Sequence, residues 1–112
     1  MVESASRILR KVLREEAFYF FSSIGNYIGE KAASLEEFSE KIKEVNSKSL
    51  EFHLNRGDFE KWVDEVLGDA GLAERIKELR NQKLVGDRLK DELYLTILER
   101  YNELKTDLLQ SV

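Results

Sequence analysis

Apolar residues recur every three or four positions along most of this chain, a spacing that places them on one face of an α-helix. The chain contains no proline, so no residue without a backbone N–H interrupts such helices. The pattern predicts helices over residues 3–16, 34–45, 47–56, 58–67, 70–82 and 85–110.

Several predicted helix ends carry residues that satisfy free backbone groups. Ser34 and Glu37 form a capping box, in which the serine hydroxyl accepts a hydrogen bond from the Glu37 amide and the glutamate reaches back. Asn46 offers a break and a new cap, and Asp58 is expected to cap the helix that follows it. Gly57 can end the preceding helix in the left-handed conformation.

Residues 17–33 do not follow the helical spacing. Five consecutive apolar residues, Ala17 to Phe21, precede Gly25 and Gly29, and they fit either an extension of the first helix or a short extended piece. We interpret them as a buried aromatic segment followed by a turn. The expected fold is therefore all-α: a single-domain orthogonal bundle of five or six helices over residues 1–112, ending in a long C-terminal helix.

The last predicted helix carries the longest apolar stripe. A helix that starts near residues 85–87 and runs to about residue 110 is roughly 35 Å long at 1.5 Å per residue, which is more than a domain this small should need. Either it packs under all the other helices, or its end contacts another chain. We take the stripe as a candidate self-association surface and expect a homodimer. Its positions are Leu89, Leu93, Ile97, Tyr101, Leu104 and Leu108.

The composition excludes several kinds of site. The 112 residues include 22 acidic and 18 basic side chains, one histidine and no cysteine. Without cysteine there are no disulfides, no zinc–cysteine sites and no thiol nucleophiles. A single histidine cannot form a histidine pair, and neither glycine-rich phosphate-binding motif is present. We therefore expect no enzyme activity, no cofactor and no metal.

The sequence also gives expectations about location. The most apolar stretch, from Ala17 to Ile28, is about 12 residues long and contains polar residues, whereas a membrane span needs about 20. Residues 1–16 carry four basic side chains but no uninterrupted apolar signal-peptide core. These features predict a cytoplasmic protein that does not enter a membrane.

Residues 34–54 can be drawn as a helix-turn-helix, which would make the protein a DNA-binding regulator. The charge argues against this alternative. Residues 34–70 hold ten acidic and five basic side chains, a net charge of −5, and DNA affinity depends on neutralising phosphates. A basic partner for this segment is the better hypothesis.

Four motifs resemble a family of small archaeal and bacterial helical domains of unknown function. A glycine–tyrosine segment upstream, Gly25-x-Tyr27-x-Gly29, also resembles that family, and the resemblance covers roughly residues 17–104. It implies a helical fold and an archaeal, cytosolic setting, and it implies no reaction. The motifs are Ser34-Leu35-x-x-Phe38, Ser49-Leu50-x-Phe52-His53, Arg56-Gly57-Asp58-Phe59-x-x-Trp62 and Leu67-Gly68-Asp69-x-x-Leu72-Ala73-x-x-Ile76.

The resemblance indicates five positions as a candidate polar cluster or ligand site: Tyr27, His53, Arg56, Asp58 and Trp62. His53 and Arg56 are one helical turn apart, and Asp58 follows a chain reversal, so Asp58 can pair with either of them. We favour a structural cluster that fixes the angle between two helices, with a small-anion site as the alternative.

Three function hypotheses follow from these observations. The leading one is a non-enzymatic protein-interaction or self-association module. The second is a sensor domain for a small ligand or an anion, because the aromatic residues of the 17–33 segment fit a ligand pocket as well as a core. The helix-turn-helix regulator is third.

Overall fold

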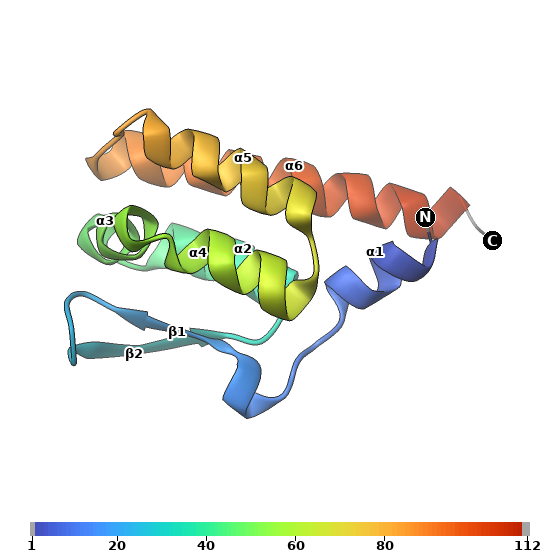
Figure 1. Cartoon of the computed structure of the whole chain (residues 1–112), viewed down its shortest axis with the longest axis horizontal. Coiled ribbons are helices and arrows are strands. Elements are labelled where there is room, and N and C mark those ends of the chain that lie inside the picture. Colours follow the sequence, from blue (N-terminus) through green and yellow to red (C-terminus); the bar gives the residue numbers. More distant parts are fainter. Residues whose placement is uncertain (1, 111–112) are drawn as a thin grey trace.

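The computed structural model describes residues 2–110, and their side chains from residue 4 onward. Figure 1 shows three layers: α5 and α6 on one side, α2, α3 and α4 in the middle, and a β-hairpin on the other side. The elements in chain order are α1 (Val2–Leu9), the 3-10 turn η1 (Arg14–Glu16), β1 (Phe18–Phe21), β2 (Tyr27–Ala32), α2 (Leu35–Glu44), α3 (Ser47–Arg56), α4 (Asp58–Trp62), the π-helical turn η2 (Val63–Leu67), α5 (Ala70–Asn81) and α6 (Gly86–Gln110).

The prediction of an all-α fold was wrong, because β1 and β2 form a two-stranded antiparallel sheet beside the six α-helices of the described residues. Along β1, Phe18 and Phe20 are buried while Tyr19 and Phe21 are partly exposed, which is the period of two that defines a strand. All four residues are aromatic, so no polar side chain marks the outer face. The strand could not be predicted from the sequence pattern, because its exposed side chains are as apolar as its buried ones.

The hairpin is irregular in a way that its glycines permit. Tyr19 pairs with Lys31, but Phe21 pairs with Tyr27, so β2 contains two more residues than β1 between these pairs. Gly29 lies within this bulge at φ +83°, a left-handed conformation that glycine adopts without a Cβ clash. The bulge lets the strand bend toward the helices.

The first helix is shorter than predicted, ending at Leu9 rather than near residue 16. The chain then runs along the hairpin side of the core, where the Val12 amide donates to the Ala33 carbonyl at 2.7 Å. The Arg10 guanidinium donates to the Val66 carbonyl at 2.7 Å, which fixes the end of α1 against η2.

The long helix α6 packs against α1, α2, α3 and α5. The structure comes close to the first of the two alternatives for its length, since α6 packs against four of the other helices. Leu89, Leu93, Ile97 and Leu104 are at most 1% exposed, and Tyr101 and Leu108 are partly buried against them. The stripe predicted to contact a second chain is thus part of this chain's own core, because helical periodicity identifies a buried face without identifying what buries it.

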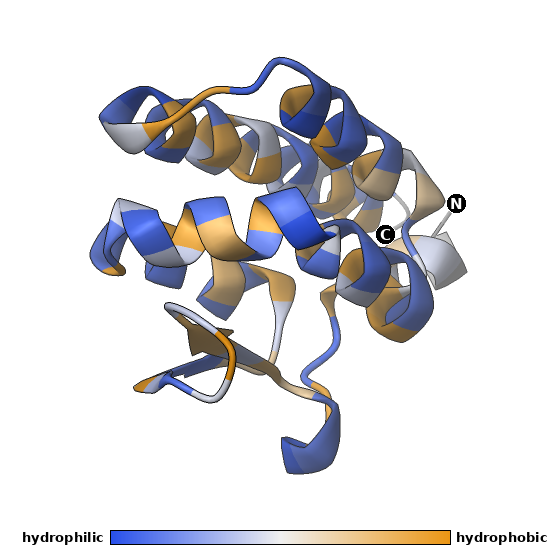
Figure 2. Ribbon diagram, turned by 60° about the vertical axis from the view of Figure 1, so that its left-hand side comes forward, coloured by the Kyte–Doolittle hydropathy of each residue, from blue (hydrophilic) through white to orange (hydrophobic). Residues whose placement is uncertain are grey.

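The helices are amphipathic, and orange and blue alternate along their ribbons in Figure 2. Within the described part of the chain, no helix has both the length and the apolar character to cross a membrane.

A buried ion pair joins the start of α5 to α6. Asp69 is 3% exposed, and its Oδ1 accepts from the Leu72 amide at 3.1 Å, which caps α5. Arg100 donates to the same carboxylate, with its Nε 2.7 Å from Oδ2. Arg100 also contacts Glu103, which forms a bidentate pair with Arg75. Asp69 therefore serves as helix cap and as counter-ion at once.

The Asp69→Ala variant should lose about 3 kcal/mol of unfolding free energy, because it removes a helix cap and leaves the Arg100 charge without its buried partner. Urea unfolding followed by circular dichroism measures the loss. Asp64→Ala, which removes the same charge from an exposed position, should change stability by no more than about 0.5 kcal/mol. Equal effects of the two substitutions would contradict the assigned role.

Candidate functional site

The hairpin is attached to α3 through the backbone of Phe21. The Ser49 hydroxyl donates to the Phe21 carbonyl at 2.7 Å, and the Phe21 amide donates to Nε2 of His53 at 2.8 Å. Ser49 and His53 are four residues apart, so they share one face of α3. Both side chains are buried. Two helix side chains thus satisfy both backbone groups of one strand residue, as a neighbouring strand would.

His53 also bridges to the start of α4. Its Nδ1 lies 2.9 Å from Oδ2 of Asp58. Because Nε2 accepts a hydrogen bond from an amide, the ring proton sits on Nδ1 and is donated to Asp58. Burial lowers the pKa of His53 below its usual 6.5, and the hydrogen bond to Asp58 only partly opposes this effect. His53 is therefore held as the neutral imidazole.

Arg56 completes this group of contacts. Its Nε donates to Oδ2 of Asp58 at 3.1 Å, and its guanidinium lies over the Phe52 ring at 5.0 Å from the centroid. Gly57 stands between α3 and α4 at φ +78°, so the chain reverses there and brings Asp58 back toward α3. Asp58 does not cap α4 as predicted, since its carboxylate is bonded to His53 and Arg56 instead.

The structure brings together three of the five predicted site residues, His53, Arg56 and Asp58. Trp62 makes a different contact: it is 7% exposed, and its indole N–H donates to the Glu16 carbonyl at 2.8 Å. This contact holds η1 against α4.

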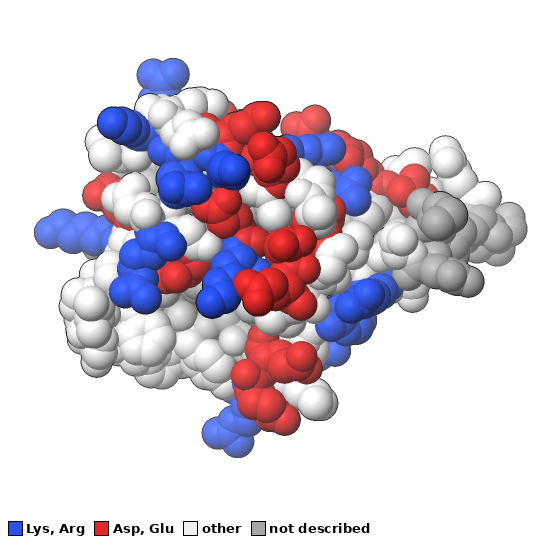
Figure 3. Space-filling view, in the orientation of Figure 1, with Lys and Arg blue, Asp and Glu red and all other residues white. Residues whose placement is uncertain are grey.

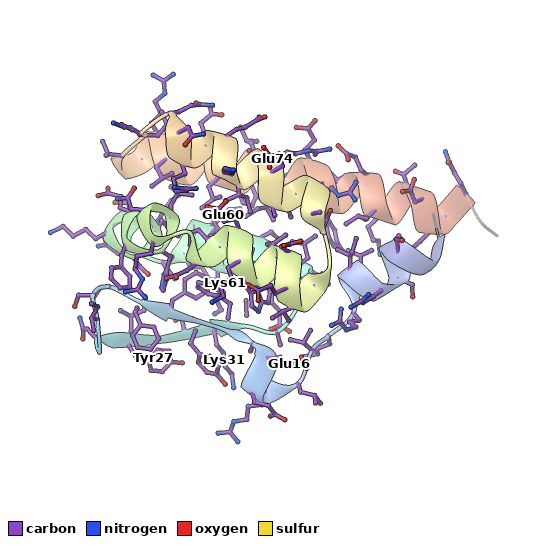
Figure 4. The ribbon with its side chains drawn as sticks, viewed as in Figure 1. Glu16, Tyr27, Lys31, Glu60, Lys61 and Glu74 are labelled. Carbon is purple, nitrogen blue, oxygen red and sulfur yellow. The ribbon has the colours of Figure 1, made fainter. Side chains whose placement is uncertain are left out.

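Tyr27 is also separate from the cluster. It lies on β2, 45% exposed, and its ring contacts those of Tyr19 and Phe21 at centroid distances of 5.8 and 5.6 Å. Figure 4 shows Tyr27 and Lys31 on the side of the hairpin that faces away from α4. Tyr27 therefore belongs to the outer surface of the hairpin.

A pocket of about 350 Å³ opens beside the cluster, between the hairpin and the α3–α4 corner. Sequence reasoning missed Ile24 and Phe52 as pocket residues. The signal for Ile24 was an isolated large apolar residue beside Gly25, at a loop position where burial was not expected. The apolar walls of the pocket include Phe21, Ile24 and Phe52, and its polar groups come from His53, Arg56 and Asp58.

The arrangement favours binding over proton transfer. Both ring nitrogens of His53 are engaged, so neither has a free lone pair or proton for a substrate. Among the described residues, no group of three or more His, Asp or Glu side chains is placed to hold a metal ion. Arg56, half exposed at the pocket, is the polar group best placed to contact a ligand.

Stability should fall in mild acid because of His53. The unfolded chain takes up this proton near pH 6.5, while the folded chain resists it because its pKa is lowered. The stabilising contribution of the neutral ring is therefore complete above about pH 6.5 and is lost as the pH falls through the lowered value. The slope of unfolding free energy against pH just below about pH 6.5 should be smaller in His53→Gln than in the wild type. Parallel slopes in urea titrations would contradict the neutral-imidazole assignment.

Comparison with known proteins places the chain in a family. No curated protein and no solved structure matches this chain. Residues 14–110 match DUF5752, described as a family of unknown function. The predicted membership in a family of unknown function is thus confirmed, while its motif pattern and its archaeal and bacterial range stay predictions. Because the match covers well over half of the sequence, the chain belongs to the DUF5752 family of unknown function.

Proposed function

We propose that this protein is a non-enzymatic protein-interaction module that binds its partner at the hairpin end of the molecule. The observation that carries the proposal is an apolar surface beside an open pocket. Ile24 is 84% exposed and Tyr27 45% exposed. We define the hairpin surface by its exposed or partly exposed apolar side chains: Tyr19, Phe21, Ile24, Tyr27 and Phe52.

The hairpin surface contrasts with the rest of the visible face. Figure 3 shows an uncharged area where Figure 1 places the hairpin, while acidic and basic side chains cover the helices above it. Contiguous exposed apolar patches are uncommon on monomeric soluble proteins and mark interaction sites. Aromatic residues are also enriched in the centres of protein interfaces.

The hairpin surface is held rigid from beneath. The backbone of Phe21 is fixed by Ser49 and His53, and the Phe52 ring is covered by the Arg56 guanidinium. A surface whose side chains are already ordered loses less conformational entropy when a partner binds. The contacts that join the hairpin to α3 thus also favour the binding of a partner at the hairpin surface.

Self-association through α6 loses its main support, because the leucine stripe is buried in the core of the chain itself. The partner we propose is another protein, or a second copy that docks through the hairpin surface.

A small ligand is the second candidate, and the pocket is the observation that favours it. Its volume of about 350 Å³ falls in the range of small-molecule sites, which combine apolar walls with a few polar groups. Thermal-shift screening against organic acids and inorganic anions separates this candidate from the first, since a ligand specific for the folded state raises the unfolding temperature.

The Ile24→Asp variant should bind a protein partner at least tenfold more weakly, because it places a charge in the centre of an apolar contact. Pull-downs that use the wild type, Ile24→Asp and Leu95→Asp as baits identify the partner. Calorimetry with the purified partner then measures the dissociation constants. Leu95 is the matched control, being an exposed leucine on α6.

Equal binding by all three baits would place the interface elsewhere. Light scattering tests the second-copy case: a doubled mass that only Ile24→Asp reduces to the monomer would identify this chain as its own partner. A failure to retain any protein, together with a monomeric mass, would remove the proposal.

A further inference from the structure

We propose that the pocket binds the C-terminal residue of a partner protein, with its apolar side chain against Phe21, Ile24 and Phe52 and its carboxylate on the Arg56 guanidinium. This inference rests on the proposed function and names the chemistry that the hairpin surface recognises.

The guanidinium of Arg56 is oriented before any ligand arrives. One edge is fixed, because Nε donates to Asp58, and one face is fixed, because it lies over the Phe52 ring. Its two Nη groups have no hydrogen-bond partner among the described residues, and the side chain is 50% exposed. Two parallel N–H donors on a rigid plane match the two oxygens of a carboxylate.

The apolar walls lie in the same small pocket as this cation. Phe21 and Ile24 come from the hairpin and Phe52 from α3. The volume of about 350 Å³ is near the lower end of the range for ligand sites, so it accommodates one large side chain with its terminal carboxylate and not a long segment. The ligand must therefore carry its apolar body and its negative charge close together.

Within a polypeptide, the C-terminal residue meets this requirement best. An acidic residue next to an apolar one does not, because adjacent side chains of an extended chain point to opposite sides. A C-terminal residue carries a carboxylate on its own Cα, and capture of that carboxylate is a recurring mode of peptide recognition.

Asp58 adds a complementary acceptor at the same site. Both of its hydrogen bonds use Oδ2, which leaves Oδ1 without a partner among the described residues. Asp58 lines the pocket, so Oδ1 can accept the backbone N–H of the terminal residue while Arg56 holds the carboxylate. A donor and an acceptor side by side fit a terminal amino-acid unit better than they fit a simple anion.

The test uses synthetic tetrapeptides Gly-Gly-Gly-Trp and Gly-Gly-Gly-Leu, each with a free or an amidated C-terminus. Titrations followed by ¹H–¹⁵N spectra of the full chain give both the affinity and the location. We expect the free acids to bind at least tenfold more tightly than the amides, since hydrogen bonds between charged groups are the stronger kind. The shifts should centre on Phe21, Ile24 and Phe52.

Arg56→Gln should abolish the preference for the free acid, and Arg88→Gln should preserve it. Arg88 is the matched control, an exposed arginine on α6. Urea unfolding checks that Arg56→Gln remains folded, and we expect this because the side chain is half exposed. A lower affinity in both variants would indicate a general charge effect and would overturn the role of Arg56.

Three results overturn the inference. Free acids and amides that bind equally would remove the carboxylate requirement. Indole-3-propionate binding as tightly as Gly-Gly-Gly-Trp would assign the pocket to small organic acids. Peptides that do not bind at millimolar concentration, or that shift other residues, would remove the site. The proposed function is judged separately by the Ile24→Asp baits, so it survives if a partner depends on Ile24 but not on Arg56.

Discussion

The hydrogen bonds between α3 and the backbone of Phe21 are the contacts on which the hairpin depends. An isolated two-stranded hairpin is marginally stable in water, and β1 has no neighbouring strand other than β2 within the described residues. Ser49 supplies the donor and His53 the acceptor that a third strand would provide. Side chains of α3 therefore take the place of a third strand at this point of β1.

The same histidine connects this hairpin attachment to the candidate site. Its Nε2 faces the strand, and its Nδ1 holds the carboxylate of Asp58, which in turn orients Arg56. The structural and the binding hypotheses for this cluster, which sequence reasoning treats as alternatives, concern two ends of one chain of hydrogen bonds. The inner end is buried against β1, and the outer end is half exposed at the pocket.

The sequence predicts best those features that depend on residues close together in the chain. The Ser34 cap and the left-handed Gly57 are fixed by residues within about one turn, and both occur as predicted, although Glu37 reaches back to the Ala33 amide, one residue before the cap. The hairpin needed longer-range information, because the aromatic run Phe18–Phe21 lacks a polarity pattern and its buried rings pack against α3 and α4. Asp58 pairs with His53 and Arg56, as its place after the chain reversal predicted, and only the helix cap predicted for it was wrong, because these contacts compete with capping.

Charge adds a constraint on the partner that shape alone does not give. Residues 34–70 carry a net charge of −5, and Figure 3 shows acidic and basic side chains together over the helices next to the uncharged hairpin area. An anionic segment that approaches Arg56 meets this repulsion at long range, before the guanidinium can contact it. Complementary potentials mainly set association rates and specificity. For the C-terminal recognition proposed above, the net charge of residues 34–70 therefore favours a partner that is basic apart from its terminal carboxylate, because such a partner meets attraction at long range and Arg56 at contact.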